Sequence, residues 1–224
     1  RSDLLPHLRF IRSLVSGEFG SDRMDYLLRD AHHVGVEYGT FDLPRIQHTL
    51  LPVETEEGVK LGIERGGLLA AEGLQWARFS MFTQVYFHRT RRILDLHLVD
   101  FLTQTLEGRR YPEEPEEYLR WDDLRVHQML IEADMDTAHP AHGSARKIIR
   151  RQQHRPLKEV IEGHDIEEVA ERLAFRVNEI RANEPHKDPM ADVVSPPPDL
   201  SKGGDLPVVI ENGEVRRLSE LSSL

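Results

Sequence analysis

The chain has 224 residues, 39% of them hydrophobic, with a formal net charge of -10 and no cysteine. That length suffices for one sizeable domain, or for a domain with a smaller appendage, and no apolar run approaches the roughly 20 residues of a membrane span. The acidic balance disfavours nucleic acid and anionic membranes as partners, while the lack of cysteine excludes disulfides and thiolate metal sites and favours the cytoplasm.

Helical periodicity dominates the first hundred residues. Apolar side chains recur at helical spacing, and polar or glycine-rich breaks separate the segments. Ser21 precedes the second helix and is suited to cap it, Asp22 and Asp25 lie in its first turn, and the helix stops near Gly35. The predicted elements are helices at 4–15 and 22–33, a β-hairpin with its turn at Glu57 and Gly58, and one or two long helices within 67–106.

The second half of the chain predicts a mixture of helices and strands. A proline-punctuated acidic connection at 111–123 leads into it, and an Asn-Gly pair at 212–213 is typical of a two-residue hairpin turn. The predicted elements are helices at 122–133, 143–151 and 165–183, a strand at 155–163, a proline-rich loop at 195–205 and a final hairpin. We therefore expect a mainly α fold, with a helical domain over 1–133 and a small α/β appendage over 134–224.

The helix that follows Ser21 carries a ladder of ionisable side chains. Asp22, Tyr26 and Asp30 are spaced four residues apart, so they share one face of a helix, and Asp25 and Arg29 are spaced to pair. The apolar positions that should face other helices are Met24, Leu27 and Leu28. Spacing alone leaves two interpretations open, namely a solvated face with local ion pairs or a carboxylate for a divalent metal beside a phosphate-binding arginine.

A family resemblance favours the second interpretation. The segment SDRMDYLLRDAHHVGVEYGTFDLPRI, residues 21–46, resembles the D-x-x-D-Y-x-x-R-D segment of HD-domain phosphohydrolases. The similar branch includes bacterial dNTP triphosphohydrolases and the mammalian SAM-and-HD-domain dNTPase. LLAAEGLQWARFSMFTQVYFHRTRRILDLHL, residues 68–98, is similar to the long helices that follow in this branch. The resemblance covers about residues 1–130 and implies an HD-type helical bundle.

The resemblance also implies roles for single residues. In the family, a histidine, a His-Asp pair and a later aspartate bind the catalytic metal, and Asp22 matches the later aspartate. Arg23 matches a basic residue that meets the nucleotide phosphates, while Tyr26 and Asp30 match positions that meet the sugar. The implied cofactor is a divalent metal ion, with Mn, Fe, Mg, Ni and Zn all open.

The chain departs from the family pattern upstream of this segment. The family's first histidine and His-Asp pair lie well before this segment. In this chain, the only histidine among residues 1–20 is His7. The literal pair His164-Asp165 occurs far downstream, where Asp165 is suited to cap a helix. We therefore expect the C-terminal part of a longer HD enzyme, lacking three of four metal ligands and poorly active by itself.

Two further groups are candidates for the site. His32 and His33 follow the ladder; His33 is a candidate catalytic residue, and a surface or capping role is the alternative. His88 and Arg89 lie in VYFHRTRR, which in relatives supplies a histidine and an arginine near the substrate phosphates, although the match slips by a residue. We assign His88 a catalytic role and Arg89 a substrate-binding role. The alternative is a helix face paired with nearby acids.

Two classes of function remain open at this stage. The first is metal-dependent hydrolysis of (deoxy)nucleoside triphosphates, in which arginines bind phosphate charge. The second is a non-catalytic nucleotide-binding or oligomer-assembly module that uses the same face. The expected partners are a nucleotide substrate and further copies of the chain in a homo-oligomer, with no membrane and no nucleic acid.

Overall fold

The fold is that of a computed structural model, which describes residues 6–56, 58–152, 154, 166–184, 189–192 and 206–222. The chain divides into two units: unit 1 comprises residues 1–86 and 196–224, and unit 2 comprises residues 87–195. The predicted strand at 155–163, the pair His164-Asp165 and the whole predicted loop at 195–205 lie outside the described residues.

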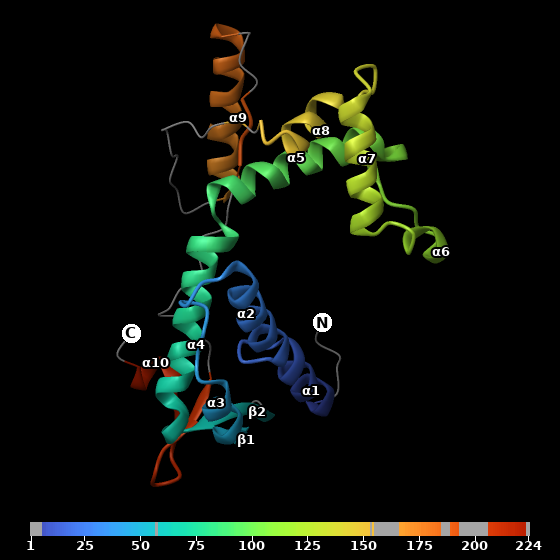
Figure 1. The fold of residues 1–224 in the computed structure, drawn as a ribbon. Coiled ribbons are helices and arrows are strands. Elements are labelled where there is room, and N and C mark those ends of the chain that lie inside the picture. The colour runs from blue at the N-terminus through green and yellow to red at the C-terminus, as the bar shows by residue number, and fades with distance from the viewer. Residues whose placement is uncertain are drawn as a thin grey trace. The chain divides into compact units, whose positions relative to one another are not determined.

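Unit 1 combines helices with a small sheet (Figure 1). Its helices are α1 (Pro6–Ser16), α2 (Ser21–Val34), α3 (Leu43–Thr49), α4 (Leu68–Met81) and α10 (Leu218–Leu221). Its strands are β1 (Leu50–Thr55), β2 (Gly58–Glu64), β3 (Pro207–Val209) and β4 (Val215–Arg217). A 3-10 turn, η1 (Arg65–Gly67), precedes α4, and a π-helical turn, η2 (Phe82–Tyr86), follows it.

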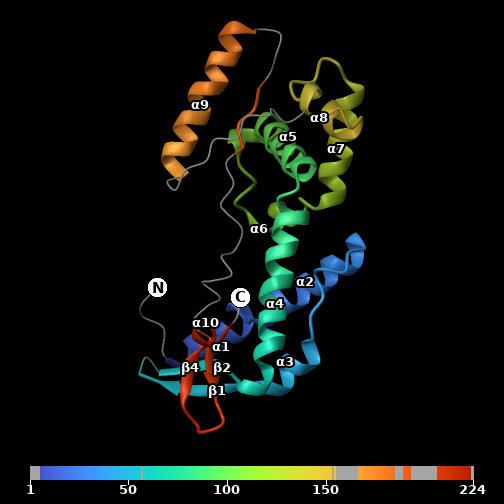
Figure 2. The same ribbon diagram turned by 90° about the vertical axis from the view of Figure 1, so that its left-hand side faces the viewer.

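The four strands form one sheet in the order β1-β2-β3-β4. The first hairpin pairs Leu50 with Ile63 in antiparallel register, and Ile63 pairs in parallel with Val208 of the last hairpin. Figure 2 shows these strands beside α10. Both predicted hairpins are therefore present, but the last one belongs to the same sheet as the first and does not form a separate appendage.

The core of unit 1 lies between α2, α4 and the sheet. Met24, Leu27 and Ala31 form the buried stripe of α2, which confirms the predicted apolar face for Met24 and Leu27. The helix ends at Gly35, whose φ of 76° is in the left-handed region that glycine tolerates. Gly20, and not Ser21, is its N-cap residue.

The regular secondary structure among the described residues of unit 2 is all helical. Its helices are α5 (Arg89–Thr105), α6 (Pro115–Tyr118), α7 (Asp123–Met135), α8 (His142–Ile149) and α9 (Ile166–Asn183), with a 3-10 turn, η3 (Glu107–Arg109), after α5. Its core holds Phe101 of α5 against Leu130, Ala133 and Ala145. The buried carboxylate of Asp134 pairs with Arg150 at 2.8 Å.

The expectation of a mainly α chain with a small strand component is confirmed in the described residues. The predicted boundary between residues 133 and 134 falls inside unit 2, so the two divisions of the chain differ and that boundary stays a prediction. None of the described helices combines the length and the apolar character needed to cross a bilayer.

Candidate functional site

Helix α2 exposes Asp22, Asp25 and Arg29 away from its buried stripe, whereas Arg23, Tyr26 and Asp30 are half-buried. Asp22 is exposed in the first turn, where its Oδ1 accepts a hydrogen bond from the backbone N–H of Arg23. The predicted pair is present, because Arg29 donates to Asp25 at 2.8 Å. The helical period therefore places the buried apolar side chains and the exposed charged side chains of α2 on different faces.

Glu18 lies in the turn before α2 and joins two arginines from different helices. Its Oε2 contacts Nη1 of Arg23 on α2 and Nη1 of Arg78 on α4. The two arginine side chains are only 21% and 17% exposed, whereas the Glu18 side chain is 44% exposed. Arg78 also lies 5.7 Å from the centre of the Phe82 ring. Two guanidinium groups and one carboxylate thus form a compact cluster with an excess positive charge.

A second polar contact joins α2 to the π-helical turn η2. Tyr86 donates a hydrogen bond from its hydroxyl to Oδ2 of Asp30 at 2.6 Å. The Tyr86 ring lies edge-on to Tyr26, with ring centres 6.3 Å apart. Nη1 of Arg29 is 3.8 Å from the other oxygen of Asp30. The structure therefore brings the predicted residues Tyr26 and Asp30 to one place, with Tyr86 as an additional member.

These contacts shift the ionisation of the groups involved. Burial raises the pKa of the Glu18 carboxyl, but the hydrogen bond from Arg23 and the charges of Arg78 and Arg23 outweigh it, so the net pKa lies below its ordinary 4.5. Burial, followed by the hydrogen bond to Asp30, raises the pKa of Tyr86 well above its ordinary value. Burial also raises the pKa of Tyr26. Both phenols therefore stay protonated at neutral pH and can donate hydrogen bonds.

His33 lies in the exposed last turn of α2. Its Nδ1 is 2.8 Å from the backbone carbonyl oxygen of Arg29, and a carbonyl only accepts, so Nδ1 carries the proton. Its ring lies edge-on to that of His32. This geometry holds the imidazole against the backbone of its own helix, and the catalytic role of His33 stays a prediction.

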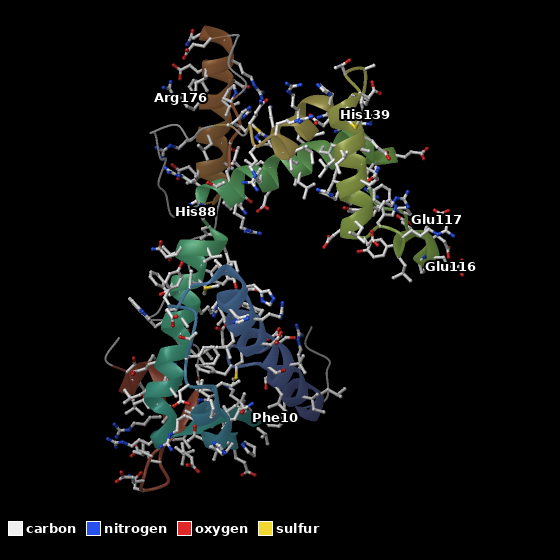
Figure 3. All side chains as sticks on the ribbon, in the orientation of Figure 1. Phe10, His88, Glu116, Glu117, His139 and Arg176 are labelled. Atoms are coloured by element: carbon white, nitrogen blue, oxygen red, sulfur yellow. The ribbon has the colours of Figure 1, made fainter. Side chains whose placement is uncertain are left out.

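His88 and Arg89 belong to unit 2, unlike the residues of α2. Figure 3 labels His88, which caps the first turn of α5 by accepting a hydrogen bond from the backbone N–H of Thr90 at 3.3 Å. The basic cluster at this end of α5 is partly neutralised, because Arg91 pairs with Asp95 and Arg92 pairs with Asp192. Arg89 is exposed on the same turn.

A metal ion would need several histidine or carboxylate side chains that converge on one point. Within the part of the chain that the structure describes, no three histidine or carboxylate side chains converge to hold a metal. Asp22 offers a single carboxylate, whereas transition-metal sites need three or four ligands. The described residues therefore do not hold a metal by themselves, and Asp22 can supply only one ligand.

The sequence analysis missed Glu18, Arg78 and Tyr86. Glu18 contacts Arg23 and Tyr86 contacts Asp30, whereas Arg78 joins the site through Glu18. Arg78 and Tyr86 lie 60 and 56 positions along the chain from Glu18 and Asp30. One signal was available, since Arg78 is an isolated cation within the largely apolar segment that forms α4. Two hollows in unit 2 lie elsewhere: one of about 460 Å³ along α9 and one of about 580 Å³ near Tyr111 and Trp121. None of the predicted site residues lines either hollow.

Sequence relatives match only part of this chain. The uncharacterized protein MJ1154 of Methanocaldococcus jannaschii is 48% identical over 82 residues, which are 37% of this chain and 18% of that protein. The uncharacterized protein YwfO of Bacillus subtilis is 40% identical over 90 residues, 40% of this chain and 20% of that protein. The chain thus matches about a fifth of the length of each relative.

Solved structures match nearly the whole chain. A hypothetical protein from Aquifex aeolicus has a TM-score of 0.67 at 28% identity, with 99% of this chain and 55% of that chain covered. A phosphohydrolase from Bacteroides thetaiotaomicron has a TM-score of 0.63 at 21% identity, with 96% and 59% covered. At 21% identity, the similarity to the phosphohydrolase shows a shared fold alone.

The family model of the HD-associated region matches residues 42–224. This match extends from α3 through both units to the end of the chain. Since it covers well over half of the residues, the chain belongs to the HD-associated region family and is an HD-domain-related protein.

Proposed function

We propose that this chain takes part in a metal-dependent phosphohydrolase that acts on (deoxy)nucleoside triphosphates, and that Arg23 and Arg78 bind the substrate's phosphates. One observation carries the proposal: two partly buried guanidinium groups from different helices converge on a single carboxylate oxygen. Guanidinium groups bind phosphate oxygens through fixed, charge-assisted hydrogen bonds, and partial burial strengthens such contacts. The phosphohydrolase from Bacteroides thetaiotaomicron, which shares the fold, is consistent with this chemistry.

The neighbouring polar residues suit the sugar of the same ligand. Asp30 receives one hydrogen bond from Tyr86 and has Arg29 near its second oxygen, so its carboxylate is fixed in direction. A carboxylate can accept further hydrogen bonds, and a sugar hydroxyl can donate one. The protonated Tyr26 hydroxyl is a further donor, and its ring lies edge-on to that of Tyr86. We propose that Tyr26 and Asp30 orient the sugar while the arginines hold the phosphates.

The metal and the histidines complete the enzymatic proposal. We propose that Asp22 gives one ligand to a divalent metal whose remaining ligands lie outside the described residues. His33 and His88 are proposed catalytic residues, and Arg89 a further phosphate contact. A homo-oligomer remains part of the proposal, and so does a cytoplasmic location, which the lack of cysteine favours.

The second candidate function is a non-catalytic nucleotide-binding or assembly module. It is favoured by the absence, in the described residues, of three side chains that could share a metal. The enzyme and the nucleotide-binding module require the same phosphate contacts, so anion binding tests what these two share. Hydrolysis then separates them.

The test of the shared requirement is calorimetric titration of the 224-residue chain with inorganic tripolyphosphate. We expect saturable binding that Arg78→Gln weakens by about tenfold or more, because a charge-assisted contact contributes about 1.5–3 kcal/mol. Arg65→Gln is the matched control, since Arg65 is an exposed arginine at the other end of α4. Equal losses in the two variants, or no saturable binding, would contradict the proposal.

A further inference from the structure

Glu18 occupies the position where the proposed phosphate would bind. A single oxygen, Oε2, lies against Nη1 of both Arg23 and Arg78. The carboxylate is 44% exposed, and the arginines are about half as exposed, so the carboxylate is the most solvent-accessible member of the cluster. A ligand that arrives from solvent and seeks the two guanidinium groups therefore meets Glu18 first.

One carboxylate does not satisfy the donors around it. Two guanidinium cations face one anion, and Nε of Arg78 is buried without a hydrogen-bond partner among the described residues. A tetrahedral dianion brings more charge and more acceptor oxygens than a carboxylate. The single carboxylate therefore balances only part of the positive charge of the two arginines.

We propose that Glu18 is a built-in competitor for the substrate's phosphate, which holds Arg23 and Arg78 in the ligand-free protein and leaves them when a phosphate binds. This inference rests on the proposed function, because it concerns the regulation of the same anion site. It assigns to Glu18 the role of setting the affinity of the site.

Electrostatic repulsion determines whether Glu18 competes with a bound phosphate or helps to bind it. The Glu18 carboxylate and a bound phosphate would be like charges sharing the same two cations, and like charges within a few ångströms repel strongly at a partly buried site. The Glu18 pKa is held low by the arginines, so the carboxylate is ionised at neutral pH. Phosphate binding therefore displaces this charge or is weakened by it.

The local backbone allows the displacement to be a side-chain rotation. The turn that carries Glu18 is fixed by hydrogen bonds from Gly17 N–H to the Ser13 carbonyl and from Gly20 N–H to the Gly17 carbonyl. Glutamate has three rotatable side-chain bonds, of which the first two have several staggered conformations and the third rotates over a broad range. The carboxylate can swing into solvent without any movement of α1 or α2.

The test compares sulfate binding by the wild-type chain and by Glu18→Gln in calorimetric titrations at constant ionic strength. Sulfate is the probe because it stays a dianion across the accessible pH range. We expect Glu18→Gln to bind sulfate about tenfold more tightly, since it removes the competing charge but keeps a polar side chain of the same size. The matched control is Glu37→Gln, an exposed glutamate beyond the opposite end of α2, which should leave the affinity unchanged.

The possible outcomes separate this inference from the proposed function. If the wild type binds sulfate and Arg78→Gln abolishes that binding, yet Glu18→Gln binds no more tightly, the competition is wrong and the anion site stands. If neither the wild type nor Glu18→Gln shows binding that depends on Arg78, the anion site and the proposed function are both wrong.

A measurement on the unmodified protein keeps the inference testable if Glu18→Gln does not fold. The pKa of the Glu18 carboxyl, followed by carbon NMR, should rise when sulfate is added, because the departing carboxylate loses its two cationic partners. Reciprocal linkage requires that sulfate and ionised Glu18 oppose each other equally. An unchanged Glu18 pKa in saturating sulfate would overturn the proposal.

Discussion

At the scale of single residues, Glu18 couples the proposed site to folding. The two arginines lower the pKa of its carboxyl below 4.5, despite the opposing effect of burial. A depressed pKa in the folded state contributes stability above the unfolded-state value, and that stability is lost as the pH falls through the folded-state value. Glu18 therefore adds stability at neutral pH even though it competes with the proposed ligand.

This linkage gives a prediction for stability against pH. Glu18→Gln should unfold at lower urea concentration than the wild type at pH 7, and the difference should shrink as the pH falls below about 4.5. The measurement is urea unfolding followed by circular dichroism between pH 3 and pH 7. A difference of the same size at pH 3 and pH 7 would contradict it. Glu37→Gln, which removes an exposed carboxylate, should show little difference at either pH.

The same glutamate illustrates a trade between stability and binding. If Glu18→Gln is less stable and binds sulfate more tightly, then one carboxylate stabilises the ligand-free fold and weakens the binding of the ligand. Both effects come from the same two ion pairs, so they should decrease together when Arg78 is replaced and only the pair with Arg23 remains.

At the scale of elements, helix α2 was predictable in detail. Its start after a glycine-containing turn, its end at Gly35 and its buried Met24 and Leu27 all follow from helical spacing and capping rules. The ion pair of Asp25 and Arg29 follows from the same spacing. These features depend on residues within a few positions of one another, which a single sequence displays.

The contacts between elements were not predictable in this way. The ion pair of Glu18 with Arg78 and the hydrogen bond of Tyr86 with Asp30 join residues 60 and 56 positions apart. Helical periodicity reports which face of an element is apolar, but it does not report which elements pack together. The parallel pairing of β2 with β3 was missed for the same reason, because both hairpins were recognisable only as local units.

Gly39 tests the packing that joins these elements. It is buried, and a Cβ at this position would lie 2.6 Å from Cβ of Ala31 on α2 and 2.7 Å from Sδ of Met81 on α4. Gly39→Ala should therefore lower the free energy of unfolding by about 1–3 kcal/mol, the usual cost of overpacking. Urea unfolding measures the change.

The matched control is Gly73→Ala on α4. A Cβ there would meet only the Cβ of Phe41, at the ordinary distance of 3.9 Å, and the residue lies inside a helix. This variant should raise the free energy of unfolding by about 0.5–1 kcal/mol, because alanine loses less backbone entropy than glycine. A Gly39→Ala variant as stable as Gly73→Ala would show that α2 and α4 do not approach as closely as described.

At the scale of the whole molecule, the predicted site residues are divided between two units. Asp22, Arg23, Tyr26, Asp30 and His33 lie in unit 1, whereas His88 and Arg89 lie in unit 2. The family match also extends over both units. A function that uses all of these residues is therefore a property of the chain as a whole, whereas anion binding at Arg23 and Arg78 requires unit 1 alone.

The last prediction concerns the metal and turnover. The described residues offer Asp22 as a lone carboxylate, and one carboxylate holds a divalent metal weakly. The 224-residue chain should therefore bind Mn²⁺ weakly and hydrolyse dGTP far below the 1–1000 s⁻¹ that is roughly typical of enzymes. Paramagnetic resonance titration with Mn²⁺ and a phosphate-release assay measure the two quantities.

Two substitutions in the first turns of α2 test whether Asp22 binds the metal. Asp22→Asn should remove the residual Mn²⁺ binding and change the free energy of unfolding by no more than about 1 kcal/mol, because the side chain is exposed at a helix start. Asp25→Asn is the matched control: it removes a carboxylate from the same helix that already pairs with Arg29, and Mn²⁺ binding should persist. Equal Mn²⁺ binding by Asp22→Asn and the wild type would exclude Asp22 as a ligand. Rapid dGTP hydrolysis by the wild-type chain would instead show that it assembles a complete metal site, with ligands beyond the residues of α2.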